Sequence, residues 1–399
     1  MRILQLCKKN PYPTFDGEAI AILSITKELN RAGNEVTLLA MNTPKHQFDI
    51  NLLPDEVKSI ARFETIFVNT QLHPLKAIVQ LLRNQSYNIA RFTSTEYQNK
   101  VIELLQTQPY NVVLMEGIYL APYLAAIRKY APQTPVFMRT HNIEHIIWQR
   151  LANEERNPLK GLYLKILAKQ FKAYEERMLP LFDGIVPISP IDAVELRRMG
   201  CKQKMFVLPA GVDTGSFPFS MPDTQSKPTL FFIGSLDWLP NRQGLVWLMN
   251  EVLHIEKKTL PDVQLFIAGR NAPADFLQIQ SNGVTIVGEV PDAINFMKEH
   301  TIMVVPLFSG SGMRVKIIEA MALGKPIIAT SIAAEGIAYT DGENLLIADT
   351  PEVFAQNIIT FLKNTDYCKQ ISLNARNFAI QNHDNRVLVK KLIEFFFEK

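Results

Sequence analysis

The sequence is poor in cysteine. Cys7, Cys201 and Cys368 are far apart, and none belongs to a C-x-x-C pair. This odd and scattered set argues against a disulfide framework and against a structural zinc site, and it is typical of a reducing compartment.

Long apolar runs are also absent. No uncharged stretch approaches the roughly 20 residues needed to span a bilayer. The first residues lead directly into a short strand and lack the apolar core of a signal peptide. We therefore expect a cytoplasmic protein that at most rests on the inner face of a membrane.

Neither sign of charge dominates. The 42 Lys and Arg residues against 39 Asp and Glu residues leave a net charge of +3, which is too small to predict a nucleic-acid partner. No G-x-G-x-x-G follows the first predicted strand, and Gly324-Lys325-Pro326 is not a P-loop, so a dinucleotide dehydrogenase is disfavoured.

What is present is a chain of 399 residues, 47% apolar and 20% charged, whose length predicts two globular domains of about 200 residues each.

The first residues alternate between strand and helix patterns. An apolar strand at 2–7, an amphipathic helix at 17–31 and a strand at 36–40 predict a parallel sheet. Asp16-Gly17 lies beyond the carboxyl end of the first strand, where such sheets meet their ligands. A single glycine there is equally an ordinary turn.

The same alternation continues along the chain. Further strands are expected at 111–115, 135–139, 229–234, 263–268 and 284–287, and further helices at 73–83, 121–130, 351–362, 369–382 and 385–398. These patterns predict a first domain at 1–208 that also includes the C-terminal helix 385–399, a linker at 209–228, and a second domain at 229–382.

The most informative stretch runs from Pro306 to Pro326. A strand at 302–305 stops at Pro306, a glycine-rich loop follows at 309–312, and a helix is expected at 313–323, ended by Gly324. The helix should turn one apolar stripe to the core; its members are Val315, Ile318, Met321 and Ala322.

Charged residues gather at the start of this helix. Arg314 and Lys316 lie where free backbone N–H groups and the positive end of the helix dipole favour an anion, and Glu319 follows about one turn later. Cations and N–H groups suit the phosphates of a nucleotide diphosphate, and the carboxylate suits the ribose hydroxyls. Lys316 and Glu319, three residues apart, are equally compatible with a solvated ion pair.

The stretch G-S-G-M-R-V-K-I-I-E-A-M-A-L-G-K-P-I-I-A-T resembles the signature of the nucleotide-sugar domain of family 4 glycosyltransferases. The resemblance continues through 334–337 and 341–344. It implies an α/β protein of the GT-B fold: two facing Rossmann-like domains with parallel sheets, and a C-terminal helix that crosses back to the first domain. It also implies retaining transfer of a sugar from a nucleotide-diphosphate sugar to an acceptor, a glycan or lipid-linked glycan in polysaccharide biosynthesis.

No cofactor and no metal are expected. The chain lacks the D-x-D motif with which the other main transferase fold holds a divalent cation. Arg314, Lys316 and the loop amides would then stabilise the departing diphosphate.

Two positions depart from the common family pattern. The loop G-S-L-D-W-L-P-N at 234–241 resembles a branch in which Ser235 replaces an arginine, and Ser311 stands where a first glutamate is usual. The resemblance implies donor-binding residues at Gly17, Ser235, Asn241, Val290, Gly310, Ser311, Gly312 and Glu319, besides His141, Arg314 and Lys316 as catalytic residues.

The hexapeptide Thr140-His141-Asn142-Ile143-Glu144-His145 has two sharp interpretations. H-x-x-E-H is the inverted zinc-protease pattern, which needs a helix and a third ligand. The stretch R-T-H-N-I-E-H-I-I-W instead resembles the transferase loop whose first histidine points toward the donor sugar, and His141 can donate or accept a proton near neutral pH. A helix-capping role is the plainer alternative for His141 and the favoured one for His145.

Residues 156–178 form a basic amphipathic pattern. The predicted apolar stripe consists of Leu159, Leu162, Tyr163, Ile166, Leu167, Phe171 and Tyr174, with four lysines around it. Such a helix could make peripheral contact with a membrane of anionic lipid; alternatively it packs on its own sheet with solvated lysines.

Two functional alternatives to a transferase remain at this point. An epimerase or phosphorylase of the same fold would act on the same donor, since fold does not fix function. A nucleotide-sugar-binding homologue without activity is compatible with Ser235 and Ser311.

Overall fold

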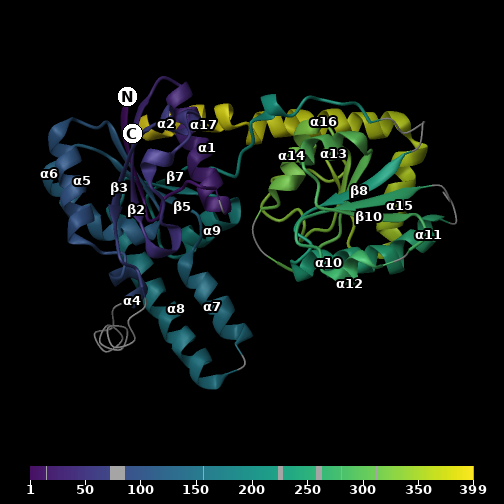
Figure 1. Cartoon of the computed structure of the whole chain (residues 1–399), viewed down its shortest axis with the longest axis horizontal. Coiled ribbons are helices and arrows are strands. Elements are labelled where there is room, and N and C mark those ends of the chain that lie inside the picture. Colours follow the sequence, from purple (N-terminus) through teal and green to yellow (C-terminus); the bar gives the residue numbers. More distant parts are fainter. Residues whose placement is uncertain are drawn as a thin grey trace. The chain divides into compact units, whose positions relative to one another are not determined.

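The computed structural model describes residues 1–14, 16–71, 86–155, 157–222, 228–257, 263–279, 281–310 and 313–398. The chain forms two compact units (Figure 1). The first comprises Met1–Pro209 and Leu388–Lys399, and the second comprises Ala210–Val387. Both are α/β, as predicted, and each is built on one parallel sheet.

Within the described residues, the first unit has a seven-stranded sheet in the order β3-β2-β1-β4-β5-β6-β7, and every pair is parallel. The strands are β1 (Arg2–Cys7), β2 (Glu35–Asn42), β3 (Arg62–Phe67), β4 (Val112–Glu116), β5 (Val136–Thr140), β6 (Gly184–Pro187) and β7 (Lys204–Met205). The strand order reverses between β1 and β4. Ligands of such sheets bind at the carboxyl ends of the strands beside this reversal.

Helices cover both faces of this sheet, as short, apolar parallel strands require. The helices of this unit are α1 (Gly17–Arg31), α2 (Asp55–Lys58), α4 (Tyr87–Ala90), α5 (Thr95–Thr107), α6 (Leu124–Tyr130), α7 (Glu144–Glu154), α8 (Pro158–Met178), α9 (Pro190–Arg198) and the last helix, α17 (Asn385–Phe397). The helix expected at 121–130 is shorter than predicted, because the turns around Pro122 form a 3₁₀ segment, Ile118–Tyr123. The helix expected at 73–83 lies outside the described residues.

The last helix completes the core of the first unit, as predicted. Phe395 and Phe396 are buried, and their ring centroids lie 5.5 and 4.7 Å from that of Phe137 on β5. Leu388, Val389 and Leu392 belong to the same cluster. The chain therefore ends in the unit in which it began.

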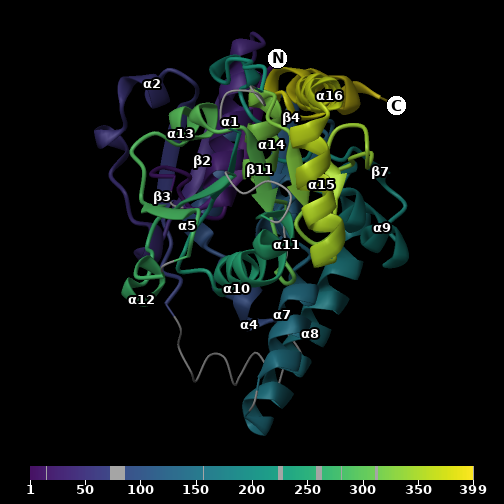
Figure 2. The same cartoon turned by 90° about the vertical axis from the view of Figure 1, so that its right-hand side faces the viewer.

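Helices α7 and α8 form an antiparallel hairpin that extends away from the sheet of the first unit (Figures 1 and 2). Trp148 of α7 stacks on Phe171 of α8 with ring centroids 6.0 Å apart. The apolar stripe predicted for α8 is only half right: Leu167 and Phe171 are buried, but the distal positions face solvent. There the buried face consists of Gly161 and Leu164, because a small residue lets the two helices approach closely.

Within the described residues, the second unit has a six-stranded parallel sheet with the same kind of order, β10-β9-β8-β11-β12-β13. The strands are β8 (Thr229–Ile233), β9 (Gln264–Ala268), β10 (Val284–Gly288), β11 (Ile302–Val305), β12 (Ile327–Ala329) and β13 (Leu346–Ile347). Its helices are α10 (Leu239–Trp247), α11 (Leu253–Lys257), α12 (Ala274–Leu277), α13 (Ala293–Glu299), α14 (Val315–Leu323), α15 (Pro351–Lys363) and α16 (Thr365–His383). The order reverses between β8 and β11.

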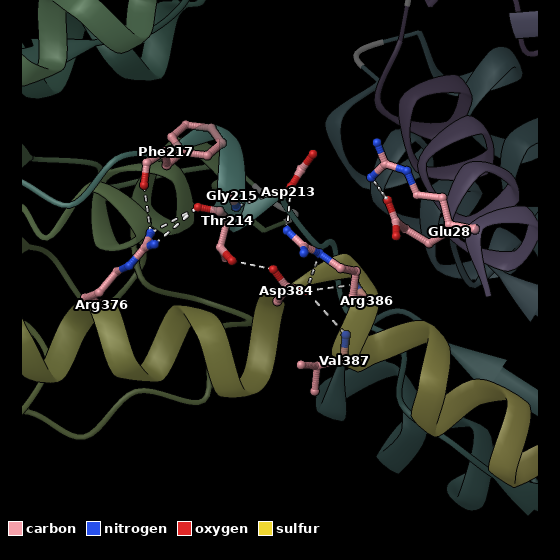
Figure 3. A network of polar contacts seen from close by, with 10 residues as sticks. Glu28, Asp213, Thr214, Gly215, Phe217, Arg376, Asp384, Arg386 and Val387 are labelled. Carbon is pink, nitrogen blue, oxygen red and sulfur yellow. Dashed lines mark hydrogen bonds and ion pairs between the residues drawn. The ribbon is translucent and has the colours of Figure 1, made fainter. Parts of the chain in front are cut away.

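The segment expected to be a linker, 209–228, is instead packed on the second unit over its first part. Arg376 of α16 donates to the carbonyl oxygens of Thr214 and Phe217 at 3.3 and 2.9 Å, and Thr214 donates to Asp384 (Figure 3). Arg386 pairs with Asp213 at 3.3 Å. These contacts attach residues 213–217, where the chain enters the second unit, to α16 and the residues that follow it.

No helix among the residues that the structure describes is long and apolar enough to cross a membrane.

Candidate functional site

Helix α14 begins at the carboxyl edge of the second sheet, after the loop that leaves β11. It starts at Val315, two residues later than predicted, so Arg314 is the residue that precedes its first turn, and it ends at Gly324, whose φ is +77°. Ile318, Met321 and Ala322 are buried as expected, but Val315 is 37% exposed. The start of the helix is therefore accessible while its body is held in the core.

An arginine and a tryptophan meet at this helix start. The Arg314 guanidinium lies over the Trp238 ring, 5.4 Å from its centroid, in a cation–π contact. Gly310, with φ +107°, makes this possible, because a Cβ there would lie 2.6 Å from the Trp238 ring. Burial lowers the pKa of Arg314 and nearby Glu335 raises it, with a net lowering. Gly310 thus leaves room for the contact that holds this partly buried cation.

Lys316 and Glu319 pair with one another. Lys316 Nζ lies 2.7 Å from Glu319 Oε2, with side chains 43% and 19% exposed. This is the ion pair that the sequence offered as the alternative to a role in ligand binding. A ligand that uses both groups must separate them or bridge them.

The loop after β8 faces the same edge of the second sheet. Asn241 is buried and donates to the Ser235 carbonyl oxygen at 2.7 Å, so it shapes the loop. Ser235 is bonded to Asp237 at 2.6 Å. Val290 is half-buried beyond the end of β10. Ser311 and Gly312 lie outside the described residues.

In the first unit, Gly17 is the first residue of α1, the helix that comes after β1 and the loop beyond Cys7. A Cβ on Gly17 would meet nothing within 4 Å, so the space over it is open. The preceding residue, Asp16, caps the helix through the Ala19 N–H and pairs with Lys9 at 2.6 Å. This arrangement leaves the backbone at Gly17 open to an approaching ligand.

Glu18 adds a half-buried carboxylate beside this loop. Its Oε2 pairs with Lys9 at 3.1 Å and with Lys8 at 3.4 Å. Burial raises the pKa of Glu18, but the charges of Lys8, His141 and Lys9 outweigh it and the net shift is downward. Its Oε1 is buried and accepts no hydrogen bond from the residues described. An ionised oxygen in that position suits a hydroxyl group of a ligand.

His141 follows β5 by one residue and is 8% exposed. Its Nε2 lies 2.7 Å from Oε2 of Glu116, the last residue of β4, which is fully buried. Gln5 Nε2 donates to the other Glu116 oxygen at 2.7 Å, and Arg139 Nη1 lies 3.7 Å from Oε2. Burial raises the pKa of Glu116, while Arg139 and the bonds from His141 and Gln5 lower it more, so the carboxyl is ionised near neutral pH.

His145 has a separate partner. Its Nδ1 lies 2.7 Å from Glu175 of α8, which also accepts from the Glu144 backbone N–H at 2.8 Å. The two histidines of the H-x-x-E-H pattern therefore bind different carboxylates, and no cluster in the described part of the chain is suited to a metal ion. The helix-capping interpretation of His145 is therefore wrong: the N–H groups of Glu144 and His145 at the start of α7 donate to Glu175, and the His145 ring contacts that same carboxylate.

Sequence reasoning missed Glu116, Arg139 and Glu18. The first two did leave a signal, since each is a charged residue near the carboxyl end of an otherwise apolar strand. Parallel strands end at a common edge, so such charges gather there. The structure brings Gly17 and His141 to this edge of the first unit, and the phosphate-binding candidates to the corresponding edge of the second.

Comparison with protein families matches two models. The model described as Glycosyltransferase Family 4 matches residues 15–216, a little over half of the chain, and the one described as Glycosyl transferases group 1 matches residues 227–364. Together they span both units.

Curated relatives are distant. An uncharacterised 44.6 kDa protein from the cps region of Klebsiella pneumoniae is 25% identical over 98% of this chain and 99% of its own length. A phosphatidyl-myo-inositol mannosyltransferase from Mycobacterium tuberculosis is 27% identical over 47% of this chain, which spans about half (53%) of that protein.

Solved structures share the fold. Sucrose-phosphate synthase from Thermosynechococcus elongatus superposes with a TM-score of 0.63 at 16% identity, covering 99% of this chain and 98% of the other. HepE from Anabaena, solved in complex with UDP, has the same TM-score and identity and covers 99% of each chain.

Proposed function

The chain belongs to glycosyltransferase family 4, and from that premise we propose that it transfers a sugar from a nucleotide diphosphate whose phosphates bind at the start of α14. It is a glycosyl-transfer enzyme of the GT-B fold. The proposal concerns the donor, the acceptor, the residues that bind them and the course of the reaction.

The observation that carries the donor assignment is the cation held at the start of α14. Arg314 is fixed on Trp238 beside the Gly310 backbone, and Lys316 follows in the first turn of a helix whose N–H groups point to its start. A pyrophosphate carries the charge and the acceptor oxygens that these groups bind. HepE, whose fold is alike, binds UDP and UDP-glucose, which supports a uridine nucleotide as the first donor to test.

In the proposed reaction, the enzyme stabilises the negative charge that develops on the leaving group. As the bond from the anomeric carbon to the phosphate oxygen breaks, negative charge grows on the departing diphosphate, and Arg314, Lys316 and the Gly310–Gly312 amides stabilise it. In this proposal they act without a metal ion, since the sequence has no D-x-D. Glu319 releases Lys316 to the phosphates and accepts from the ribose hydroxyls. The anomeric configuration is retained.

The acceptor is a glycan or a lipid-linked glycan. The mycobacterial relatives are named for mannose transfer to a phosphatidylinositol, which is a lipid. Helix α8 supports contact with a membrane: Leu159, Leu162, Tyr163 and Ile166 lie at helical spacing on one face, with exposed fractions from 39% to 80%. Exposed lysines flank this face, and the combination suits anionic lipid.

The test is a donor screen followed by product analysis. Thermal shifts against UDP, GDP and ADP sugars identify the donor, and anomeric proton signals of the product report its configuration. We expect turnover only when an acceptor is present. Conversion of the donor sugar without acceptor would indicate an epimerase, binding without turnover would indicate an inactive homologue, and an inverted product would contradict the retaining course.

A further inference from the structure

We propose that Glu116 is a positioning residue that fixes a proton on His141 Nε2, so that the ring, when neutral, offers Nδ1 to the substrate as a hydrogen-bond acceptor. The inference rests on the proposed function, because the substrate that would meet His141 is the sugar of the proposed donor.

The first step is geometric. Glu116 Oε2 lies 2.7 Å from His141 Nε2, and both side chains are more than nine-tenths buried. This contact occupies Nε2, so Nδ1 is the ring nitrogen that remains for a ligand. At 2.7 Å one of the two atoms must donate a proton to the other.

The hydrogen-bond donor in this contact is the His141 ring. Arg139 Nη1, 3.7 Å from the same carboxylate oxygen, and Gln5 Nε2, 2.7 Å from the other, both favour an ionised carboxylate. An ionised carboxylate only accepts. Nε2 therefore carries a proton, and in the neutral ring Nδ1 carries the lone pair.

Neighbouring side chains hold the Glu116 carboxylate in this position. Gln5 is oriented in turn by Thr26 of α1, whose hydroxyl donates to Gln5 Oε1 at 2.7 Å, and Arg139 is tied to the Ala21 carbonyl of the same helix at 3.2 Å. Three elements thus fix Glu116, which has no freedom to leave His141. An Nδ1 lone pair accepts from a hydroxyl, such as those of a sugar, and does not bind a second acceptor.

The test needs no substrate for its first part. Long-range ¹⁵N–¹H spectra of histidine-labelled protein, with His141 assigned by the His141→Asn variant, distinguish the imidazolium from the two neutral tautomers, and a pH series in the same spectra identifies the pH at which the ring is neutral. We expect Nε2–H for His141. An Nδ1–H tautomer would overturn the inference whether or not the enzyme turns over, so this result is independent of the proposed function.

The second part uses Glu116→Gln. Gln5 still needs an acceptor, so we expect the new amide to turn its oxygen to Gln5 and its NH₂ to His141, which shifts His141 toward Nδ1–H. The expected result is a fall in kcat of about tenfold or more, the loss of one hydrogen bond to the substrate. Glu116→Asp keeps the carboxylate and should keep the tautomer and restore part of kcat.

A matched control separates positioning from stability. Glu175→Gln changes the other buried Glu–His pair, His145–Glu175, which has the same 2.7 Å contact. It should lower the unfolding temperature without changing kcat. A Glu116→Gln variant that keeps the Nε2–H tautomer, or that loses it with an unchanged kcat, would also overturn the inference.

Discussion

Arg314 gives the sharpest prediction at the scale of single residues. Its guanidinium is held on Trp238 beside Gly310, where it would meet the departing diphosphate. Arg314→Ala and Lys316→Ala should each lower kcat by about 10²–10³-fold, as the loss of one transition-state donor does in other enzymes.

The matched control is Lys363→Ala, which removes an exposed lysine from the end of α15 in the same unit. Circular dichroism should show all three variants folded. Near-normal kcat in both Arg314→Ala and Lys316→Ala would place the phosphates elsewhere.

A buried lysine makes the stability of the second unit depend on pH. Lys325 is 2% exposed and donates to the carbonyl oxygens of His300 and Lys298 at 2.7 and 3.1 Å. Burial, with a smaller effect from Lys298, lowers the pKa of Lys325 to about 8. The unfolded chain, with a lysine pKa near 10.4, therefore binds more protons between these two values, and stability rises with pH there.

Urea unfolding from pH 8 to 9.5 measures this effect. The free energy of unfolding of the wild type, minus that of Lys325→Met, should rise by about 1 kcal/mol per pH unit. The difference should be flat below about pH 7, where the lysine is protonated in both states. A difference that falls between pH 8 and 9.5 would contradict the lowered pKa.

At the scale of elements, helix α8 shows where periodicity is not enough. The sequence predicts one apolar stripe along its whole length, and the stripe exists. Its distal half is nevertheless exposed, since the hairpin extends away from the sheet and α7 covers only the side that carries Gly161 and Leu164. The spacing of apolar residues shows that they share one face of the helix, whereas their burial depends on which other element packs against that face.

The exposed face predicts membrane binding. Leu159→Gln combined with Leu162→Gln should weaken binding to anionic phosphatidylglycerol vesicles at least tenfold, because burial of each leucine contributes about 1.5–3 kcal/mol. Co-sedimentation measures it. Leu373→Gln, at an exposed leucine of α16, is the control and should bind the vesicles as the wild type does. If the α8 double variant also bound them as the wild type does, this face of α8 would not be the membrane-binding surface.

At the scale of the whole molecule, the last helix belongs to the core of the first unit. Phe395 is 3% exposed and packs against Phe137, whereas Phe397, two residues later, is 62% exposed. Phe395→Ala should therefore cost about 3–5 kcal/mol in the free energy of unfolding, while Phe397→Ala should stay within about 0.5 kcal/mol.

Hydrogen exchange locates the effect. Phe395→Ala should reduce protection in the peptides of the first unit, residues 1–209, although the substitution lies near the end of the chain. Protection in the second unit should not change. Loss of protection confined to the second unit would contradict the packing of α17.

The sequence by itself determined the alternation of strands and helices, the two α/β units and the helix that begins beside Arg314, because apolar periodicity, glycines and prolines act over a few neighbouring residues. Only the tertiary structure decided that Glu116 holds His141 and that Glu175 holds His145. Each of these histidines lies at least 25 residues from its glutamate partner in the sequence. A local pattern carries no information on which strand ends will be neighbours, and that adjacency, set by the order of the parallel sheet, is what brings buried charges together.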